Sequence, residues 1–294
     1  MPAGIIDGKQ IAAQMRAELR EQVTSLFEHN IVPGLGVILV GSDPASQSYV
    51  TAKEKACEEI GIYSDDNRLA ADTTEEQLLD LVAGMNRDPK IHGILVQLPL
   101  PKHINEARVL LAIDPRKDVD GFHPVSVGRM VIGHETFLPC TPHGVVQLLR
   151  RSGVTLEGAD VVIVGRSNIV GKPLANMLMQ KSSTGNATVT VCHTSTKDIA
   201  KYTRAADIVI AATGRPNTIT ADMVRAGAVV IDVGVNRVPD ASKKNGFRLV
   251  GDVDFDAVSK KASLITPVPG GVGPMTITML LYNTVTSAKR FAGR

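Results

Sequence analysis

The sequence contains no tryptophan and few other aromatic residues, four tyrosines and six phenylalanines among 294 residues. Proteins that bind single-stranded nucleic acid stack bases on aromatic side chains, so this scarcity argues against such a role. The formal net charge is only +2 and no long basic run occurs. Both features disfavour nucleic acid as a partner.

Features of membrane and secreted proteins are also missing. No apolar stretch approaches the roughly 18 residues of a transmembrane helix, and residues 1–9 lack the charged-then-apolar pattern of a signal peptide. The three cysteines, Cys57, Cys140 and Cys192, are far apart and form no C-x-x-C pair, which is typical of buried thiols in a reducing compartment. The seven histidines show no metal-ligand spacing. We therefore expect a cytoplasmic protein without a metal or a membrane.

The remaining composition is that of a globular protein long enough for two domains. Apolar runs rich in Val and Ile alternate with helical patterns, as in parallel sheets covered by helices on both faces. Strands are expected at 35–40, 91–96, 160–165, 187–192, 207–211 and 228–233. Helices are expected at 10–27, 45–60, 73–85, 105–113, 142–151, 172–181, 197–203, 220–225 and 275–291. Residues 118–139, 236–248 and 266–274 are expected to form loops.

This pattern predicts two α/β domains, the second a Rossmann-like parallel sheet, with an active-site cleft between them. The first is expected to comprise residues 1–140 together with 275–294, because the last helix lies beyond the second sheet. The second is expected to comprise residues 141–274.

The run from Ala159 to Pro173 is the most informative segment. It is typical of a buried strand, a tight turn from Gly165 to Gly171 and a helix start, which aim backbone N–H groups and a helix dipole at an anion such as a pyrophosphate. It departs from the pattern G-x-G-x-x-G, because Ser167 replaces the middle glycine and the last glycine comes one residue late. Taken alone, such a loop is as often an ordinary tight turn.

The next strand favours NADP over NAD. NAD-binding folds carry an acidic residue at that strand end for the ribose 2′-hydroxyl, whereas here the segment 193–196 carries hydroxyls and no carboxylate. Arg166 in the turn and Thr194 would suit a 2′-phosphate. The alternative is that these hydroxyls cap the next helix, which we expect of Thr196.

Tyr49 and Lys53 share a helix face at i, i+4 spacing; on spacing alone a solvated pair is the simpler interpretation. The pair is also found in short-chain dehydrogenases, but there it follows the nucleotide loop, whereas here it precedes it by more than 100 residues. Gln97 follows an expected strand, where the prolines of Leu98–Pro101 would form a rigid shelf or simply end the strand.

Two further loops carry ligand-like residues. A metal site could be formed by Asp118, Asp120 and His123, but no third hard ligand is evident. Binding of a polar heterocycle by a single carboxylate is an equal alternative. The segment 269–276 holds three glycines in four residues, which serve either as a connector or for close approach to a ligand.

Six segments in this order resemble the bifunctional methylenetetrahydrofolate dehydrogenase/methenyltetrahydrofolate cyclohydrolase family. Each is weak alone, but together they span about 230 residues in register. They are Tyr49-Val-Thr-Ala-Lys53, Val96-Gln-Leu-Pro-Leu-Pro101, Lys117-Asp-Val-Asp-Gly-Phe-His123, Pro139-Cys-Thr-Pro142, Gly165-Arg-Ser-Asn-Ile-Val-Gly-Lys-Pro173 and Pro267-Val-Pro-Gly-Gly-Val-Gly-Pro-Met-Thr276.

The resemblance implies NADP-dependent oxidation of 5,10-methylenetetrahydrofolate to the 5,10-methenyl form, followed by hydrolysis to 10-formyltetrahydrofolate. It implies that Lys53 is the main catalytic residue, modulated by Gln97, that Tyr49 stacks on the folate and that Asp120 holds the pterin edge. The folate side would also include Leu98, Pro99, Gly270, Gly271 and Thr276. The first domain would then bind folate, and the chain would form a homodimer through the dinucleotide-binding domain. A cis peptide is expected before Pro99.

The expected NADP-binding residues follow the strand ends of the second domain. Thr194 stands where many relatives carry serine, which keeps the hydroxyl. The full set is Thr141, Gly165, Arg166, Ser167, Ile169, Val170, Gly171, His193, Thr194, Ala212, Thr213, Gly214, Val233, Gly234 and Val235.

Two other functions remain to be tested. An NADP-dependent amino- or hydroxy-acid dehydrogenase would need an arginine for the substrate carboxylate, and neither Arg68, Arg87 nor Arg108 is expected at a strand end. A nucleotide-sensing domain without catalysis would leave the residues of the first domain scattered.

Overall fold

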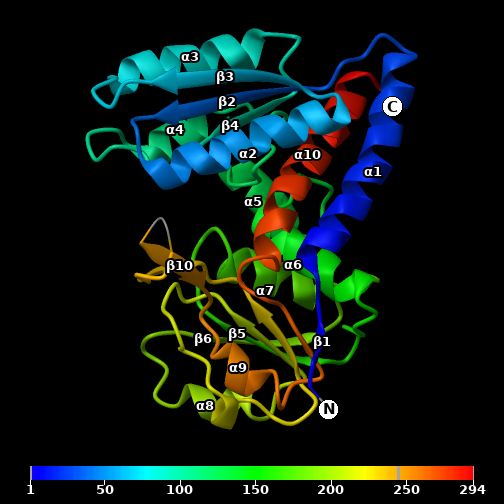
Figure 1. Cartoon of the computed structure of the whole chain (residues 1–294). Helices are drawn as coiled ribbons and strands as arrows, with labels where there is room; N and C mark the ends of the chain where they lie inside the picture. The colour runs from blue at the N-terminus through cyan, green and yellow to red at the C-terminus, as the bar shows by residue number, and fades with distance from the viewer. Residues whose placement is uncertain (1, 244–245, 294) are drawn as a thin grey trace. The chain divides into compact units, whose positions relative to one another are not determined.

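The computed structural model describes residues 2–243 and 246–293, which form two compact units (Figure 1). Unit 1 comprises Met1–Ala12 and Thr141–Thr276, and unit 2 comprises Ala13–Cys140 and Ile277–Arg294. The chain passes from one unit to the other within helix α1 (Gly8–Phe27), at the start of α6 (Cys140–Arg151) and within α10 (Val272–Phe291).

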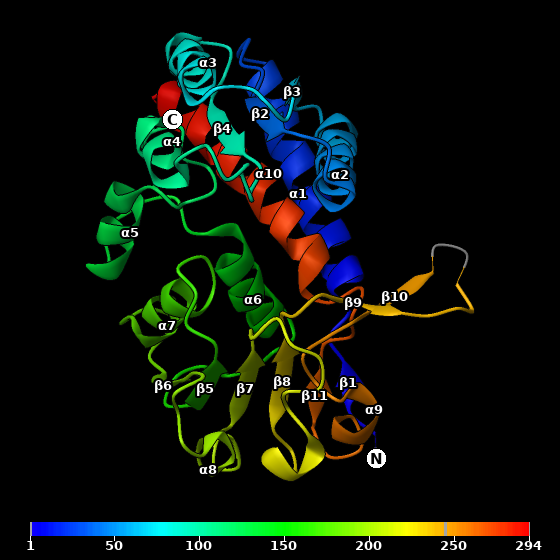
Figure 2. The ribbon, with the colours of Figure 1, turned by 90° about the vertical axis from the view of Figure 1, so that its left-hand side faces the viewer.

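Unit 1 is built on a six-stranded parallel sheet of order β1-β11-β8-β7-β5-β6, which Figure 2 shows from β6 on the left to β1 on the right. Its central strands are continuous apolar runs, and β5, β7 and β8 are almost fully buried. The strands are β1 (Gly4–Ile5), β5 (Asp160–Val164), β6 (Thr188–Cys192), β7 (Ile208–Ala211), β8 (Val229–Asp232) and β11 (Leu264–Ile265).

The strand order defines a candidate ligand-binding edge of this sheet. Strand β5 has β6 on one side and β7 on the other, so the connections that follow β5 and β6 leave in opposite directions. Ligands of open α/β sheets bind outside the carboxyl ends of the strands at such a reversal. The connecting elements are α7 (Gly171–Met179), α8 (Ile199–Thr203), the single 3₁₀ turn Ala221–Met223 and α9 (Phe255–Val258). An antiparallel hairpin of β9 (Asn236–Pro239) and β10 (Phe247–Val250) extends away from the sheet (Figure 2).

Unit 2 contains a three-stranded parallel sheet of order β3-β2-β4, formed by Tyr63–Leu69, Gly34–Val40 and Gly93–Val96. Because side chains alternate along a strand, Ile38 and Val40 face one layer, where they pack with Ile94, Val96 and the apolar faces of α3 (Glu75–Arg87) and α4 (Glu106–Ala112). Figure 2 shows α3 and α4 on one side of this sheet and α1, α2 (Pro44–Ile60) and α10 on the other.

Several elements differ from expectation. Strand β3 was not predicted, because its sequence Tyr-Ser-Asp-Asp-Asn-Arg-Leu is polar, as a half-exposed edge strand permits. Helix α5 (Pro124–Val131) lies within the expected loop 118–139 and begins at a proline after the His123 cap. The helix expected at 220–225 is a single 3₁₀ turn. Strands β9 and β10 lie at the two ends of the expected loop 236–248, and α10 begins at Val272 within the expected loop 266–274. The short strands β1 and β11 and helix α9 were not predicted either.

The compact units also differ from the expected division at the N-terminus. Residues 1–12 were expected with the first domain, but Gly4 and Ile5 pair with Leu264 and Ile265 as the edge strand of the unit 1 sheet. Such a two-residue pairing leaves no periodic pattern in the sequence.

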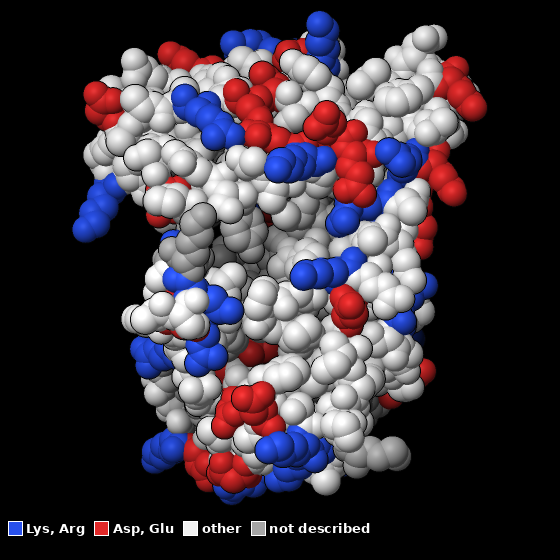
Figure 3. Space-filling view, viewed as in Figure 1, with Lys and Arg blue, Asp and Glu red and all other residues white. Residues whose placement is uncertain are grey.

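Charges of both signs are interspersed on the face shown in Figure 3. This distribution agrees with the net charge of +2. No helix among the described residues is long and apolar enough to cross a lipid bilayer.

Candidate active site

Helix α2 carries two of the expected catalytic residues of unit 2. Asp43 caps its first turn by accepting from the Ser46 N–H at 2.8 Å, and Gly61 ends it in a left-handed conformation with φ of 85°. Between these ends, Tyr49 and Lys53 lie one turn apart. The Lys53 side chain is buried, with 6% exposure, whereas Tyr49 is 40% exposed and its ring centroid lies 6.0 Å from Lys53 Nζ. The solvated-pair interpretation is therefore wrong for Lys53.

Gln97 faces Lys53 from the carboxyl end of β4. Lys53 Nζ donates to Gln97 Oε1 at 3.0 Å, and Gln97 Nε2 donates to the Leu98 carbonyl at 2.7 Å. The second bond fixes the amide so that its oxygen points to the lysine. The backbone N–H of Gln97 continues the sheet to the Ile38 carbonyl at 2.8 Å. A residue 44 positions away in the sequence is thus held against α2 by strand pairing.

The polar surroundings of Lys53 contain a neutral amide in direct contact and a carboxylate further off. Burial lowers the pKa of the Lys53 ammonium, and the charge of Asp120 opposes that shift. Burial also raises the pKa of Asp120, while Lys53 opposes that change. The two groups therefore act on one another, which indicates that Asp120 lies near the amine. Since Gln97 cannot carry a charge, it orients the amine without restoring a high pKa.

The loop that carries Asp120 is held by its neighbours. Asp118, buried with a pKa raised to about 6 by that burial, accepts from the Phe122 N–H at 3.2 Å and the His123 N–H at 2.9 Å. Lys117 Nζ donates to the carbonyls of Met85 and Asp88 at 2.9 and 2.7 Å, at the end of α3. These bonds fix the loop on both sides of Asp120.

Helix α10 supplies a second support through Asn283, which the sequence analysis missed. Asn283 Nδ2 donates to the carbonyls of Val119 and Leu138 at 2.8 and 3.0 Å. The Cys140 thiol donates to the Val119 carbonyl at 3.4 Å and lies beside Asp120. One buried amide therefore joins the segments that precede Asp120 and Cys140. The signal was an asparagine on the apolar face of the last helix.

Other expected folate residues take different positions. Leu98 is half-buried and Pro99 is exposed, and the peptide between them is cis, as the resemblance implies. Gly270, Gly271 and Thr276 belong to unit 1, where the Thr276 hydroxyl hydrogen-bonds that of Thr141 at 2.9 Å.

In unit 1 the expected cofactor residues follow the ends of four adjacent parallel strands. Gly165–Gly171 follow β5, His193 and Thr194 follow β6, Ala212–Gly214 follow β7, and Val233–Val235 follow β8. Carboxyl ends of parallel strands meet at one edge of a sheet, so the structure brings these segments together there.

The glycines of the first segment allow close backbone packing. Gly165 has φ of 134°, and a Cβ there would overlap the Ala212 carbonyl; a Cβ at Gly171 would overlap the Gly165 carbonyl. The Ser167 hydroxyl, in place of the usual middle glycine, accepts from the N–H groups of Val170 and Gly171 at 3.1 and 3.4 Å. The departure from G-x-G-x-x-G thus supplies a hydroxyl that accepts from backbone N–H groups just before and at the start of α7.

Arg166 and Thr194 are exposed at this edge, as a 2′-phosphate would require, and Ile169 is exposed as well. The expected helix cap at Thr196 is wrong. The Thr196 hydroxyl accepts from the His193 N–H at 2.9 Å and so closes the turn, whereas Asp198 caps α8 by accepting from the Lys201 N–H at 3.1 Å.

The alternative functions gain no support. His123 Nδ1 accepts from the Val125 N–H at 3.1 Å and so caps α5, and no group of three potential metal ligands occurs among residues 2–243 and 246–293. Arg68 and Arg108 are paired with Glu54 and Glu75.

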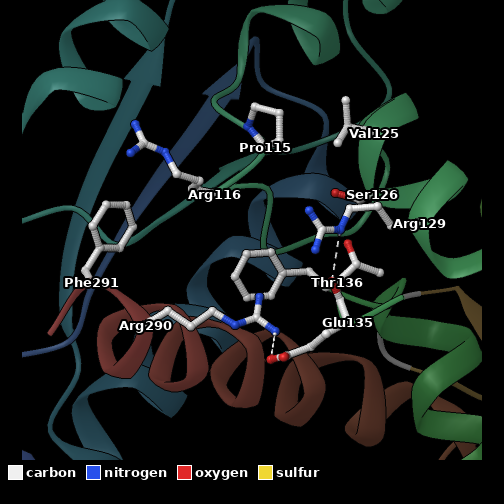
Figure 4. Close-up of a pocket in the computed structure, with 10 residues that line it drawn as sticks. Pro115, Arg116, Val125, Ser126, Arg129, Glu135, Thr136, Arg290 and Phe291 are labelled. Carbon is white, nitrogen blue, oxygen red and sulfur yellow. Dashed lines mark hydrogen bonds and ion pairs between the residues drawn. The ribbon is translucent and has the colours of Figure 1, made fainter. Parts of the chain in front are cut away.

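Figure 4 shows a cavity of unit 2 of about 510 Å³ that contains none of the expected site residues. Three arginines line it, but Arg290 pairs with Glu135 at 2.7 Å, and Arg129 Nε donates to the Glu135 carbonyl at 3.0 Å. Arg116 pairs with Asp114. Most of its positive charge is therefore neutralised within the protein.

Comparison with known proteins identifies the class of this two-unit α/β protein. Residues 6–120 match the tetrahydrofolate dehydrogenase/cyclohydrolase catalytic domain, and residues 139–292 match the NAD(P)-binding domain of the same family. The chain belongs to the tetrahydrofolate dehydrogenase/cyclohydrolase family.

Its relatives match over their full length. The chain is 59% identical to "Bifunctional protein FolD" of Syntrophus aciditrophicus over 293 residues, with 100% of both chains covered, and 60% identical to the protein of that name from Dehalococcoides mccartyi, with 100% and 99% covered. Among solved structures, a Trypanosoma brucei methylenetetrahydrofolate dehydrogenase-cyclohydrolase complexed with NADP cofactor and inhibitor is 43% identical, with a TM-score of 0.95 and 100% of both chains covered. The bifunctional enzyme of Campylobacter jejuni is 52% identical, with a TM-score of 0.92 and 98% and 99% covered.

We predict that Asn283→Leu lowers the free energy of unfolding of the protein by about 2–4 kcal/mol, because it removes the amide donor of two carbonyls and leaves that of Val119 with only the weak Cys140 thiol donor. Thr284→Val is the matched control. Thr284 is also buried, but its hydroxyl donates to the Leu280 carbonyl of its own helix, so the control should cost no more than about 1 kcal/mol. Urea titration followed by circular dichroism measures both, and equal losses would contradict the role given to Asn283.

Proposed function

We propose that this chain oxidises 5,10-methylenetetrahydrofolate to 5,10-methenyltetrahydrofolate with NADP⁺ and then hydrolyses the product to 10-formyltetrahydrofolate. Family membership supports both steps. The observation that carries the proposal is a buried Lys53 amine, hydrogen-bonded to the neutral Gln97 and near Asp120. These side chains come from three separate segments of unit 2.

The residues of unit 1 fit NADP. Gly165 and Gly171 allow the tight backbone turn that places the start of α7, with its dipole, at the carboxyl edge of the sheet, and Arg166 is exposed in that turn. The turn after β6 carries the exposed Thr194 and no carboxylate. NADP⁺ supplies the hydride acceptor for the first step, and in this proposal Arg166 and Thr194 bind its 2′-phosphate while the segments after β7 and β8 bind its other end.

The residues of unit 2 are proposed to hold folate. A pterin presents a ring N–H and an amino group side by side, and a carboxylate such as Asp120 can accept from both. The exposed ring of Tyr49 offers a face on which an aromatic substrate can stack. Leu98, Pro99, Gly270, Gly271 and Thr276 complete the proposed substrate contacts.

Hydrolysis requires a group that accepts and then returns a proton. Water adds to the cationic methenyl carbon, and the neutral Lys53 amine accepts the proton that the water loses. As the bond from that carbon to N5 breaks, the hydroxyl that came from water releases its proton to solvent and becomes the formyl oxygen, and the Lys53 ammonium returns its proton to N5. Burial lowers the pKa of Lys53, which favours both the acceptance and the return of a proton, and a cationic substrate lowers that pKa further.

We further propose a homodimer formed through the NADP-binding unit, in the cytoplasm. Strand β6 is an edge strand without charge or proline, and its Val191 is 36% exposed. An edge of this kind favours pairing with another chain. The three cysteines are free and buried, as in proteins of reducing compartments. Sedimentation analysis tests the dimer, which a single monomeric species would rule out.

We predict that Lys53→Met abolishes hydrolysis of methenyltetrahydrofolate, because the proton acceptor is lost, while the protein still folds and binds NADP⁺. Lys55→Met, an exposed lysine of the same helix, should keep the parent activity. The decrease in absorbance of the methenyl compound measures turnover, and hydrolysis at the parent rate by the Lys53 variant would show that the mechanism is wrong.

We predict that Gln97→Glu moves the acidic limb of the pH–rate profile of hydrolysis to higher pH by about one to three units. A carboxylate beside Lys53 stabilises the ammonium and raises its pKa, so a higher pH is needed to form the neutral amine. Gln97→Met, which adds no charge, should not move the limb upward. Initial rates between pH 5 and 10 provide the measurement, and the same shift in both variants would refute the electrostatic role of Gln97.

We predict that Arg166→Ala raises the KM for NADP⁺ by about 10- to 100-fold, the value of a charge-assisted hydrogen bond to phosphate. The KM for NAD⁺ should stay the same, since NAD⁺ has no 2′-phosphate. Lys181→Ala, an exposed cation beyond the end of α7, is the control. If the KM values for both nucleotides rise together, Arg166 does not read the 2′-phosphate.

A further inference from the structure

Two carboxylates are buried at the cofactor edge of unit 1. Asp232 ends strand β8 with 3% exposure, and Asp252 follows β10 with 0% exposure. Neither belongs to the proposed cofactor contacts. Within residues 2–243 and 246–293 neither takes part in an ion pair. A buried charge without a counter-ion is costly unless hydrogen bonds satisfy it, so their partners indicate what they do.

Asp252 bonds the segment that follows β7. Its Oδ2 accepts from the backbone N–H groups of Thr213 and Gly214 at 2.6 and 2.9 Å. Its Oδ1 accepts from Asn236 Nδ2 at 2.9 Å. The carboxylate therefore satisfies two consecutive N–H groups in the way a bound anion would, and it fixes the path of the chain through Thr213 and Gly214.

Asp232 in turn fixes Asp252. It accepts from the backbone N–H groups of Asp252 and Val253, both at 2.9 Å, and from that of Gly234 at 3.1 Å. One carboxylate thus holds the backbone that carries the other. Through Gly234, it also holds the segment after β8.

Two glycines leave room for this arrangement. A Cβ at Gly234 would overlap the Asp252 carboxylate, and a Cβ at Gly251 would overlap that of Asp232. Gly234 is buried and packs against Asp252.

We propose that Asp252 is a positioning residue for the cofactor. It holds Thr213 and Gly214 in the conformation that receives NADP⁺, and Asp232 supports it. The proposal rests on the proposed function, because it takes the segment after β7 to be a cofactor contact. The sheet itself does not need the pair, since β7 and β8 are joined by their own ladder.

The test compares cofactor affinity with hydrolysis, whose proposed catalytic residues Lys53, Gln97 and Asp120 lie in unit 2. Asp252→Ala should raise the Kd for NADP⁺, measured by calorimetry, by tenfold or more, and leave kcat/KM for methenyltetrahydrofolate hydrolysis within twofold. Asp252→Asn should recover most of the affinity, because its amide oxygen can accept from the same two N–H groups while Asn236 turns its own oxygen toward the new NH₂.

Asp254→Ala is the matched control. Asp254 lies two residues further on and accepts from the Ala257 N–H at 3.3 Å as the cap of α9. Its loss removes a carboxylate-to-backbone bond that does not involve the cofactor segments. We expect a small decrease in Tm and an unchanged Kd.

Two outcomes for Asp252→Ala overturn the proposal. One is an unchanged Kd for NADP⁺. The other is a parallel loss of affinity and hydrolysis, which would show a general structural role. If Asp252→Ala does not fold, Asn236→Ala takes its place, with an expected rise in Kd of about threefold, and no rise overturns the proposal. A wild-type protein that fails to bind NADP⁺ overturns the proposed function and this proposal together, whereas wild-type binding with unchanged variants overturns this proposal alone.

Discussion

Backbone polar groups in the loops at strand ends must find hydrogen-bond partners when they are buried, and both units depend on meeting this requirement with distant side chains. In unit 2, Asn283 bonds the carbonyls of Val119 and Leu138, and Ser287, one turn further along α10, donates to the His92 and Arg116 carbonyls at 2.5 and 3.0 Å. In unit 1, Asp252 satisfies N–H groups instead. The loops that carry the proposed site residues are therefore rigid without belonging to a regular element.

The surroundings of Lys53 explain why it can be reactive. Its hydrogen-bond acceptor is the neutral Gln97 oxygen, and the charge of Asp120 opposes the effect of burial only in part, so that the pKa of Lys53 stays lowered. A carboxylate in place of Gln97 would hold the proton on the lysine. The neutral contact leaves burial as the dominant influence on the pKa, which is the condition that proton transfer needs.

The sequence predicts well what local pattern encodes. The apolar strands β5, β7 and β8 and the turn at Gly165–Gly171 follow from short segments, and with the six family motifs the fold class and family were predicted correctly. Strand β3 was missed because an edge strand can be polar. Support by Asn283 and Asp252 was missed because their partners lie up to 164 residues away. Such long-range contacts leave no periodic pattern in the sequence. The signal that indicates them is a polar residue among apolar neighbours.

Asp252 and Lys53 are both buried, but they differ in the number of their hydrogen-bond partners. The Asp252 carboxylate has three donors, two of them backbone N–H groups that cannot turn away, so its charge is stabilised by dipoles fixed in place. The Lys53 amine has one neutral acceptor on a side chain, and burial therefore favours its uncharged form. The number and rigidity of the partners therefore distinguish a carboxylate that holds a loop from an amine that can gain and lose a proton.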